Sequence, residues 1–154
     1  MMLNEGPRVF NPQEFAQSVA QSQGYELIAA RCALAQSRSP QVRMFAERML
    51  VDHARIGKAM HEAALASGLV PPQPHVGGDQ MRFLASLQSL RGTGFDREYA
   101  RQQMLVHTSA STTMRSYAAK GSDANLRRSA LVAIPIIEHH LQMARQMKDA
   151  LGEP

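Results

Sequence analysis

Apolar residues recur at intervals of three and four along most of the chain, which is the spacing of an α-helix with one buried face. Residues 126–151 form one such stripe, and similar stripes run through residues 12–37 and 40–67. No segment shows the alternation of apolar and polar residues that indicates a β-strand. The pattern therefore predicts an all-α fold.

Helix-starting and helix-ending residues divide this pattern into elements. Asn11-Pro12 and Ser39-Pro40 each place an N-cap residue before a proline at the first helical position. The segment LVPPQPHVGGD, residues 69–79, holds too many prolines and glycines for regular structure. These signals predict four long helices, over residues 12–37, 40–67, 95–121 and 123–152. They also predict one short helix over residues 79–91.

Short links within two helix pairs and one long crossover between the pairs are typical of a ferritin-like four-helix bundle. The short helix would then lie in the crossover. A chain of 154 residues is long enough to bury an ordinary core as one domain. We therefore expect an N-terminal tail over residues 1–11 and a single bundle domain over residues 12–152.

Composition and charge exclude several classes of protein. The net charge is +4 and the basic residues are spread among acids, whereas a nucleic-acid binder usually gathers basic charge on one face. One cysteine, Cys32, excludes an internal disulfide and a cysteine-based zinc site. No apolar run is long enough to span a membrane, and the first residues lack a signal peptide. We expect a cytoplasmic location for the chain as given, or a periplasmic one if a leader was removed.

Polar residues interrupt the buried stripes of the long helices. At 100° per residue, Glu26 and His53 lie within their stripes, and His140 lies about 60° from the centre of the last stripe. His107 lies nearer the border of its stripe, at about 80° by the same geometry. His139 falls on the opposite side and should be solvated. Counting residues from the interhelical turns places Glu26, His53, His107 and His140 near the middle of the bundle.

Pro135 is a second irregularity of the last helix. It has no amide hydrogen to donate to the carbonyl of Leu131, so we expect a bend one turn before His140. Such a bend would aim His140, or admit water or a ligand beside it.

Three segments together resemble the bacterial domain-of-unknown-function family 4142: VRMFAERMLVDHARIGKAM, GTGFDREYARQQMLVHTS and LVAIPIIEHHLQMARQM. The shared pattern is roughly V-R-x-F-A-x-x-M-x-x-D-H, F-D-x-x-Y, a histidine in the third long helix and L-P-x-x-x-x-H-L. The likeness extends from about Phe15 to Met147. It implies a ferritin-like bundle whose polar positions map onto Glu26, Asp52, His53, Asp96, His107 and His140.

This chain departs from the family pattern at two places. Many relatives have Asp-His-Glu in the third long helix, where this chain has Val106-His107-Thr108 and so lacks both carboxylates. The Leu-Pro of the family is Ile134-Pro135 here. Relatives are often expected to be exported, and the family name itself implies no reaction.

The polar residues favour one metal site. Glu26, His53, His107 and His140 offer three imidazoles and a carboxylate, a set suited to zinc, iron, manganese or copper. Asp52 or Glu138 would serve as a fifth ligand or as an acceptor that fixes a histidine tautomer. A ferritin-type di-iron site is disfavoured, because it needs Glu-x-x-His on two helices and the chain contains no such motif.

Two other functions stay open at this stage. In the first, the bundle is metal-free, the inward groups form a hydrogen-bonded network, and the protein is an interaction or stress-related structural module. In the second, an inward histidine acts as a general base beside a pocket near Pro135. Either could accompany a homodimer formed through outer helix faces. The sequence thus favours a metal-binding protein that is non-enzymatic or weakly catalytic.

Overall fold

The computed structural model describes residues 10–152, and residues 1–9 of the predicted tail lie outside this range. The described chain forms five helices and no strand, which confirms the predicted all-α class. The helices are α1 (Pro12–Gln36), α2 (Pro40–Ala66), α3 (Gly78–Ser89), α4 (Gly92–Lys120) and α5 (Ala124–Leu151).

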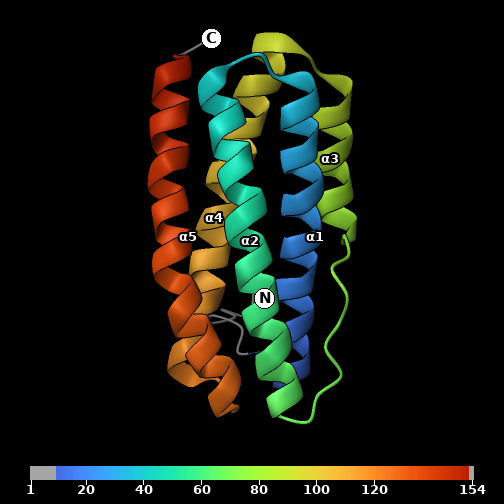
Figure 1. Ribbon diagram of the computed structural model, residues 1–154, viewed down its shortest axis with the longest axis vertical. Helices are drawn as coiled ribbons and strands as arrows, with labels where there is room; N and C mark the ends of the chain where they lie inside the picture. The colour runs from blue at the N-terminus through green and yellow to red at the C-terminus, as the bar shows by residue number, and fades with distance from the viewer. Residues whose placement is uncertain (1–9, 153–154) are drawn as a thin grey trace, which may run out of the picture.

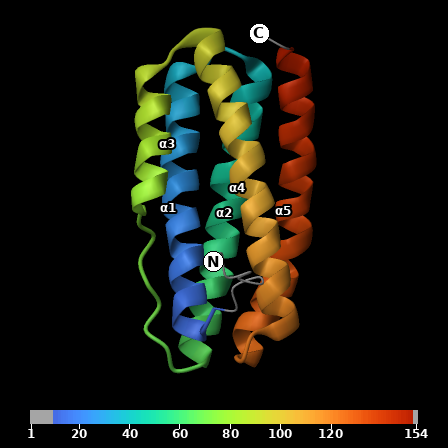
Figure 2. The same ribbon diagram turned by 180° about the vertical axis from the view of Figure 1, so that it is seen from behind.

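The four long helices lie side by side as two antiparallel hairpins (Figure 1). One hairpin is α1 with α2 and the other is α4 with α5; α2 also packs on α5, and α1 on α4. The crossover returns from one end of the bundle to the other, so α4 runs in the same direction as α2 (Figure 2). This is the pair-crossover-pair plan of ferritin-like folds, as the pattern predicts.

Helix starts follow the predicted capping chemistry at three places. The side chains of Asn11, Ser39 and Asp123 accept hydrogen bonds from backbone N–H groups three residues later, at 2.8, 3.4 and 2.9 Å. The predicted start of the third long helix near Phe95 is wrong by one turn. Helix α4 begins at Gly92, because the N–H of Phe95 bonds the carbonyl of Arg91 and closes an earlier turn.

The apolar core has two parts, one toward each end of the bundle. The first part surrounds Phe45, Phe95 and Tyr99, and the second surrounds Phe15 and Tyr117, whose rings stack 4.0 Å apart. On each of α2, α4 and α5 a buried histidine lies between the residues given to one part and those given to the other. A polar layer therefore separates the two apolar cores.

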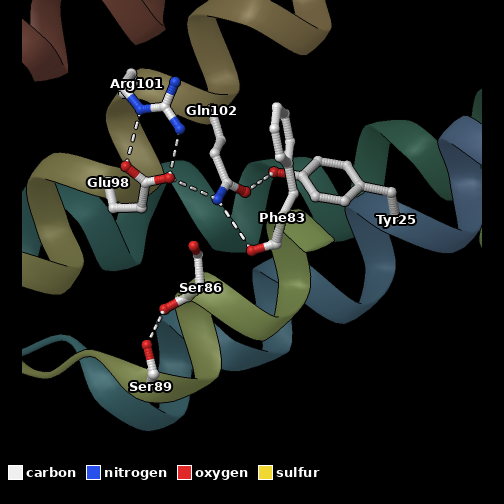
Figure 3. Close-up of polar contacts among 7 residues, drawn as sticks. All are labelled: Tyr25, Phe83, Ser86, Ser89, Glu98, Arg101 and Gln102. Carbon is white, nitrogen blue, oxygen red and sulfur yellow. Dashed lines mark hydrogen bonds and ion pairs between the residues drawn. The ribbon is translucent and has the colours of Figure 1, made fainter. Parts of the chain in front are cut away.

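Helix α3 is fixed to α1 and α4 by a polar network (Figure 3). The hydroxyl of Tyr25 donates to Oε1 of Gln102 at 2.6 Å, and Nε2 of Gln102 donates to the carbonyl of Phe83 at 3.0 Å. The same Nε2 reaches Glu98, which also holds Arg101. The amide of Gln102 thus joins the three helices at one point.

Residues 69–77, here called the proline strap, lie along the outside of the α1–α2 hairpin (Figure 1). The backbone N–H of His75 donates to the carbonyl of Ala20 at 3.2 Å. Gly24 permits this approach, because a Cβ at that position would lie 2.1 Å from the carbonyl oxygen of His75. The strap is therefore held directly against α1.

Pro135 lies within α5, and the helix continues through it. Its ring is exposed, as is Leu131, whose carbonyl loses the usual donor. Solvent can satisfy that carbonyl, which explains why the proline is tolerated. In Figure 1 the first turns of α5 lean across the lower end of the bundle and the rest of the helix runs upright. A bend caused by Pro135 stays a prediction.

Gly24→Ala should lower the free energy of unfolding by about 1–3 kcal/mol, because the added methyl displaces the backbone of the strap. The matched change Gly57→Ala should raise it by about 0.5–1 kcal/mol, since a Cβ at Gly57 meets nothing closer than 3.7 Å and alanine favours a helix. Urea unfolding of both variants measures the difference. Equal effects of the two substitutions would show that the strap does not rest on Gly24.

Candidate metal centre

His107 is anchored by its own helix. Its Nδ1 lies 2.9 Å from the carbonyl oxygen of Gln103, one turn earlier in α4. A carbonyl only accepts hydrogen bonds, so Nδ1 must carry the hydrogen. In the neutral ring, Nε2 is then a bare lone pair. The residue is fully buried, although the helical pattern placed it near the border of the buried face.

His140 is anchored across the bundle by Asp52. Its Nε2 lies 2.8 Å from Oδ2 of Asp52, and Nε of Arg48 donates to the same oxygen at 2.7 Å. Burial raises the pKa of Asp52, but hydrogen bonds from His140 and Arg48 outweigh burial and lower it overall. Asp52 is therefore ionised and accepts a hydrogen from Nε2, which leaves Nδ1 of a neutral His140 as a second bare lone pair.

These two lone pairs face each other. Nε2 of His107 lies 3.3 Å from Nδ1 of His140, and both side chains are buried. The contacts with Gln103, with Asp52 and between the rings need three hydrogens, whereas two neutral imidazoles supply two. The arrangement is therefore short of one positive charge, which either a proton or a metal ion would supply.

His53 completes the group from α2. One ligand atom from each of His53, His107 and His140 lies within 4.8 Å of the others. The ring centroid of His53 is 5.3 Å from that of His140 and 5.7 Å from that of His107. Both ring nitrogens of His53 are buried without a hydrogen-bond partner among the described residues. Unlike the other two rings, His53 is not held in one orientation by a hydrogen bond to any described residue.

Burial keeps the three rings neutral. It lowers the pKa of His107 to about 3 and that of His53 well below the ordinary 6.5, and repulsion from neighbouring histidines adds to both shifts. Burial also lowers the pKa of His140, although Asp52 opposes this effect. Neutral imidazole is the form that binds metals. Near pH 7 the three rings are thus ready to act as ligands.

Glu26 lies outside the group of three histidines. Its side chain is buried, and Oε2 has no hydrogen-bond partner in the described structure. Burial raises the pKa of Glu26 to about 8, while the nearby Gln103 amide opposes the rise. The carboxyl is therefore mostly protonated at pH 7. Its place among the ligands stays a prediction.

The other sequence-derived positions lie apart from the histidines. Glu138 contacts Arg115 and Ser111 on α4, and no contact with the histidine group is present among the described residues. Asp96 accepts a 2.5 Å hydrogen bond from the hydroxyl of Ser37 and so ties α4 to the end of α1. His139 is exposed, as its helical position predicts.

Two supporting residues were missed by the sequence analysis. The carbonyl of Gln103 fixes the tautomer of His107, and Arg48 shares Asp52 with His140. Gln103 lies four residues before His107, and Arg48 lies four residues before Asp52, so helical spacing offered a signal for both. Which side chains actually turn toward the histidines was not readable from that spacing.

Comparison with family models matches residues 5–147 to the domain of unknown function DUF4142. The match covers most of the chain, so the protein belongs to this family. Comparison with curated proteins and with solved structures finds no match. None of the helices in residues 10–152 combines the length and apolar character needed to cross a membrane.

The buried neutral state of His53 predicts a pH dependence of stability. Its folded pKa lies below the ordinary 6.5, so the unfolded chain binds a proton that the native protein excludes as the pH falls. Neutral His53 therefore contributes its full stability above pH 6.5. Below that pH, this group lowers the free energy of unfolding by about 1.4 kcal/mol for each pH unit.

In metal-free protein, His53→Leu should reduce the slope of the free energy of unfolding against pH. The expected reduction is about 1.4 kcal/mol per pH unit between about pH 5.5 and 4.5. Urea unfolding in the presence of a chelator measures the slope. His139→Leu, at an exposed position, should keep the wild-type slope. A His53→Leu slope equal to that of the wild type would mean that the ring is protonated in the native protein.

Proposed function

We propose that the protein binds one divalent transition-metal ion through His53, His107 and His140. The observation that supports this is the missing hydrogen between Nε2 of His107 and Nδ1 of His140, which lie 3.3 Å apart. A metal ion accepts both lone pairs at once and needs no hydrogen between them. The role that follows is metal binding without a defined reaction, either non-enzymatic or weakly catalytic.

The donor set favours zinc among the candidate metals. Three neutral imidazoles suit zinc, copper or iron better than the harder manganese. Two nitrogens at tetrahedral angles around Zn²⁺ are about 3.3–3.4 Å apart, given Zn–N distances of about 2.0–2.1 Å. The separation between His107 and His140 falls in that range. His53, which has no hydrogen bond to a described residue, would rotate inward to supply the third nitrogen.

Asp52 would support a metal-binding histidine without itself binding the ion. Metal-binding histidines usually donate their other N–H to a carboxylate or a carbonyl, which fixes the tautomer and strengthens the ligand. Asp52 does this for His140, and the carbonyl of Gln103 does it for His107. Glu26 would supply the fourth ligand atom if a bound ion drew its carboxyl in and displaced its proton.

The alternative function is a metal-free structural or interaction module. In that case His140 carries an extra proton and donates Nδ1–H to His107, so the layer becomes a closed hydrogen-bonded chain. The direction of the His140 pKa opposes this, because burial outweighs the attraction of Asp52. The two functions differ in one measurable respect, since a chelator changes the melting temperature only if a metal is bound.

Protein prepared without a histidine tag should retain about one metal ion per chain after dialysis against zinc, measured by elemental analysis. His140→Ala and His107→Ala should lose it, whereas His139→Ala, one position before His140 in α5, should keep it. A ligand at 100 times its Kd stabilises by about 2.7 kcal/mol, so a chelator should lower the melting temperature of the wild type. Equal, negligible metal in every sample, with no effect of chelator, would favour the metal-free module.

Glu26→Gln tests the fourth ligand. If the carboxylate binds the ion, this variant should weaken zinc at least about tenfold, which corresponds to about 1.4 kcal/mol. If Glu26 stays protonated and remote, the affinity should not change, because glutamine resembles the neutral acid in shape. Competition with a chelating dye measures the affinity, and circular dichroism checks that the bundle is intact.

A further inference from the structure

A cavity of about 270 Å³ lies between α1, α2 and the proline strap. It exists because the two helices face each other there mainly with small side chains. The strap forms the outer wall with Pro71, Pro72 and Pro74. The helical walls are mostly apolar: Ala16, Val19, Ala20, Gly57, Met60 and Ala64.

The outer wall suits an apolar molecule. Proline has no backbone N–H, so three of the strap residues bring no donor that water must satisfy. The wall is also held in place, since His75 bonds the carbonyl of Ala20 and its backbone lies against Gly24. A molecule bound here would therefore contact hydrocarbon over most of its surface.

The same cavity reaches two unsatisfied polar side chains. His53 lines it and is only 3% exposed, and neither of its ring nitrogens has a partner among the described residues. A neutral imidazole always carries one N–H, and a metal-bound imidazole still carries its other N–H. Gln23 also lines the cavity, and its Oε1 is buried without a partner. His53 therefore requires a hydrogen-bond acceptor at the inner end. The Gln23 oxygen needs a donor in its present orientation, and only after the amide turns over does its NH₂ group face the same acceptor.

Charge at the mouth favours an anion. Lys58 lines the cavity, and no carboxylate does among the described lining residues. A concave site with charge of one sign attracts the opposite charge. A second cavity, of about 430 Å³, reaches His53 from the α4 side, but its rim carries the uncharged Ser18, Gln21, Ser109 and Thr113. That rim suits water rather than an anion.

We propose that the cavity beneath the proline strap binds a small monocarboxylate with an apolar body. One carboxylate oxygen accepts the N–H of His53, and the Gln23 amide turns its NH₂ group toward the other oxygen. The hydrocarbon part packs between the prolines and Met60, and Lys58 attracts the anion at the mouth. The site does not require a bound metal, because His53 has an unsatisfied N–H with or without one.

Calorimetric titration of the full chain with hexanoate tests this proposal, with hexan-1-ol and hexylammonium as probes of matched length. The protein is used metal-free after dialysis and again after loading with zinc. Hexanoate should bind once per chain in both forms. Hexylammonium should bind at least about tenfold more weakly, and hexan-1-ol at least about threefold more weakly.

Gly57→Leu should weaken hexanoate at least about tenfold, because its side chain fills the cavity. A Cβ at Gly57 meets nothing closer than 3.7 Å, and Gly57 lines the cavity that the rest of the leucine would enter. Gly94→Leu, on an exposed stretch of α4, is the matched control and should bind normally. Lys58→Gln should weaken binding about threefold at low salt, whereas Lys148→Gln should not. The Lys58 variant also provides the test if Gly57→Leu does not fold.

Three outcomes would overturn the proposal: no saturable hexanoate binding in either form, binding of either matched probe as tight as that of hexanoate, or full affinity in a folded Gly57→Leu variant. Different results would contradict the metal proposal. Hexanoate binding in a protein that takes up no zinc would remove the metal and keep this site. Zinc uptake without hexanoate binding would do the reverse.

Discussion

The contact between His107 and His140 constrains the whole interior. Each ring donates its one hydrogen outward, to a backbone carbonyl and to a carboxylate, so two lone pairs face each other at 3.3 Å. In water such a pair would simply turn away or bind a proton. Here both rings are enclosed, and burial opposes their protonation. A cation placed between the two nitrogens is the simplest relief of that conflict.

The rest of the bundle can hold this arrangement because apolar cores lie on both sides of it. The hydrogen bond between Asp52 and His140 joins residues 88 positions apart, on α2 and α5. Long helices that cross both cores fix the relative heights of these residues. Burying unpaired polar atoms costs about 1–3 kcal/mol each, and the apolar packing at either end offsets that cost. The polar layer therefore lowers the stability that the two apolar cores provide.

His53 connects the two sites. It belongs to the histidine group, and it also lines the cavity beneath the proline strap. No described residue bonds either ring nitrogen, so under the two proposals one nitrogen would face an ion and the other a small molecule. Occupation of one site would thus orient the ring for the other. If both proposals hold, metal and anion binding would be coupled through this ring.

The sequence by itself determined the helices, their breaks and which faces are buried. Capping residues such as Asn11 and Ser39 act on their own first turn, and a helical period is local, so both are readable along the chain. The placing of His53, His107 and His140 on inward or near-inward positions followed from the same period. By helical angle, His107 lies near the border of its predicted buried stripe. Packing between the helices nevertheless buries it completely.

Only the tertiary structure decided which atoms meet. Glu26 shares the inward face of α1 yet lies outside the histidine group, and Glu138 turns to Arg115 at the surface. Asp52, only on the flank of its stripe, reaches His140 instead. Helical period gives the direction of a residue to within tens of degrees, but side-chain torsions and helix tilt move a polar atom by several ångströms. Those torsions and tilts are set by packing between helices far apart in the chain, and no local pattern records them.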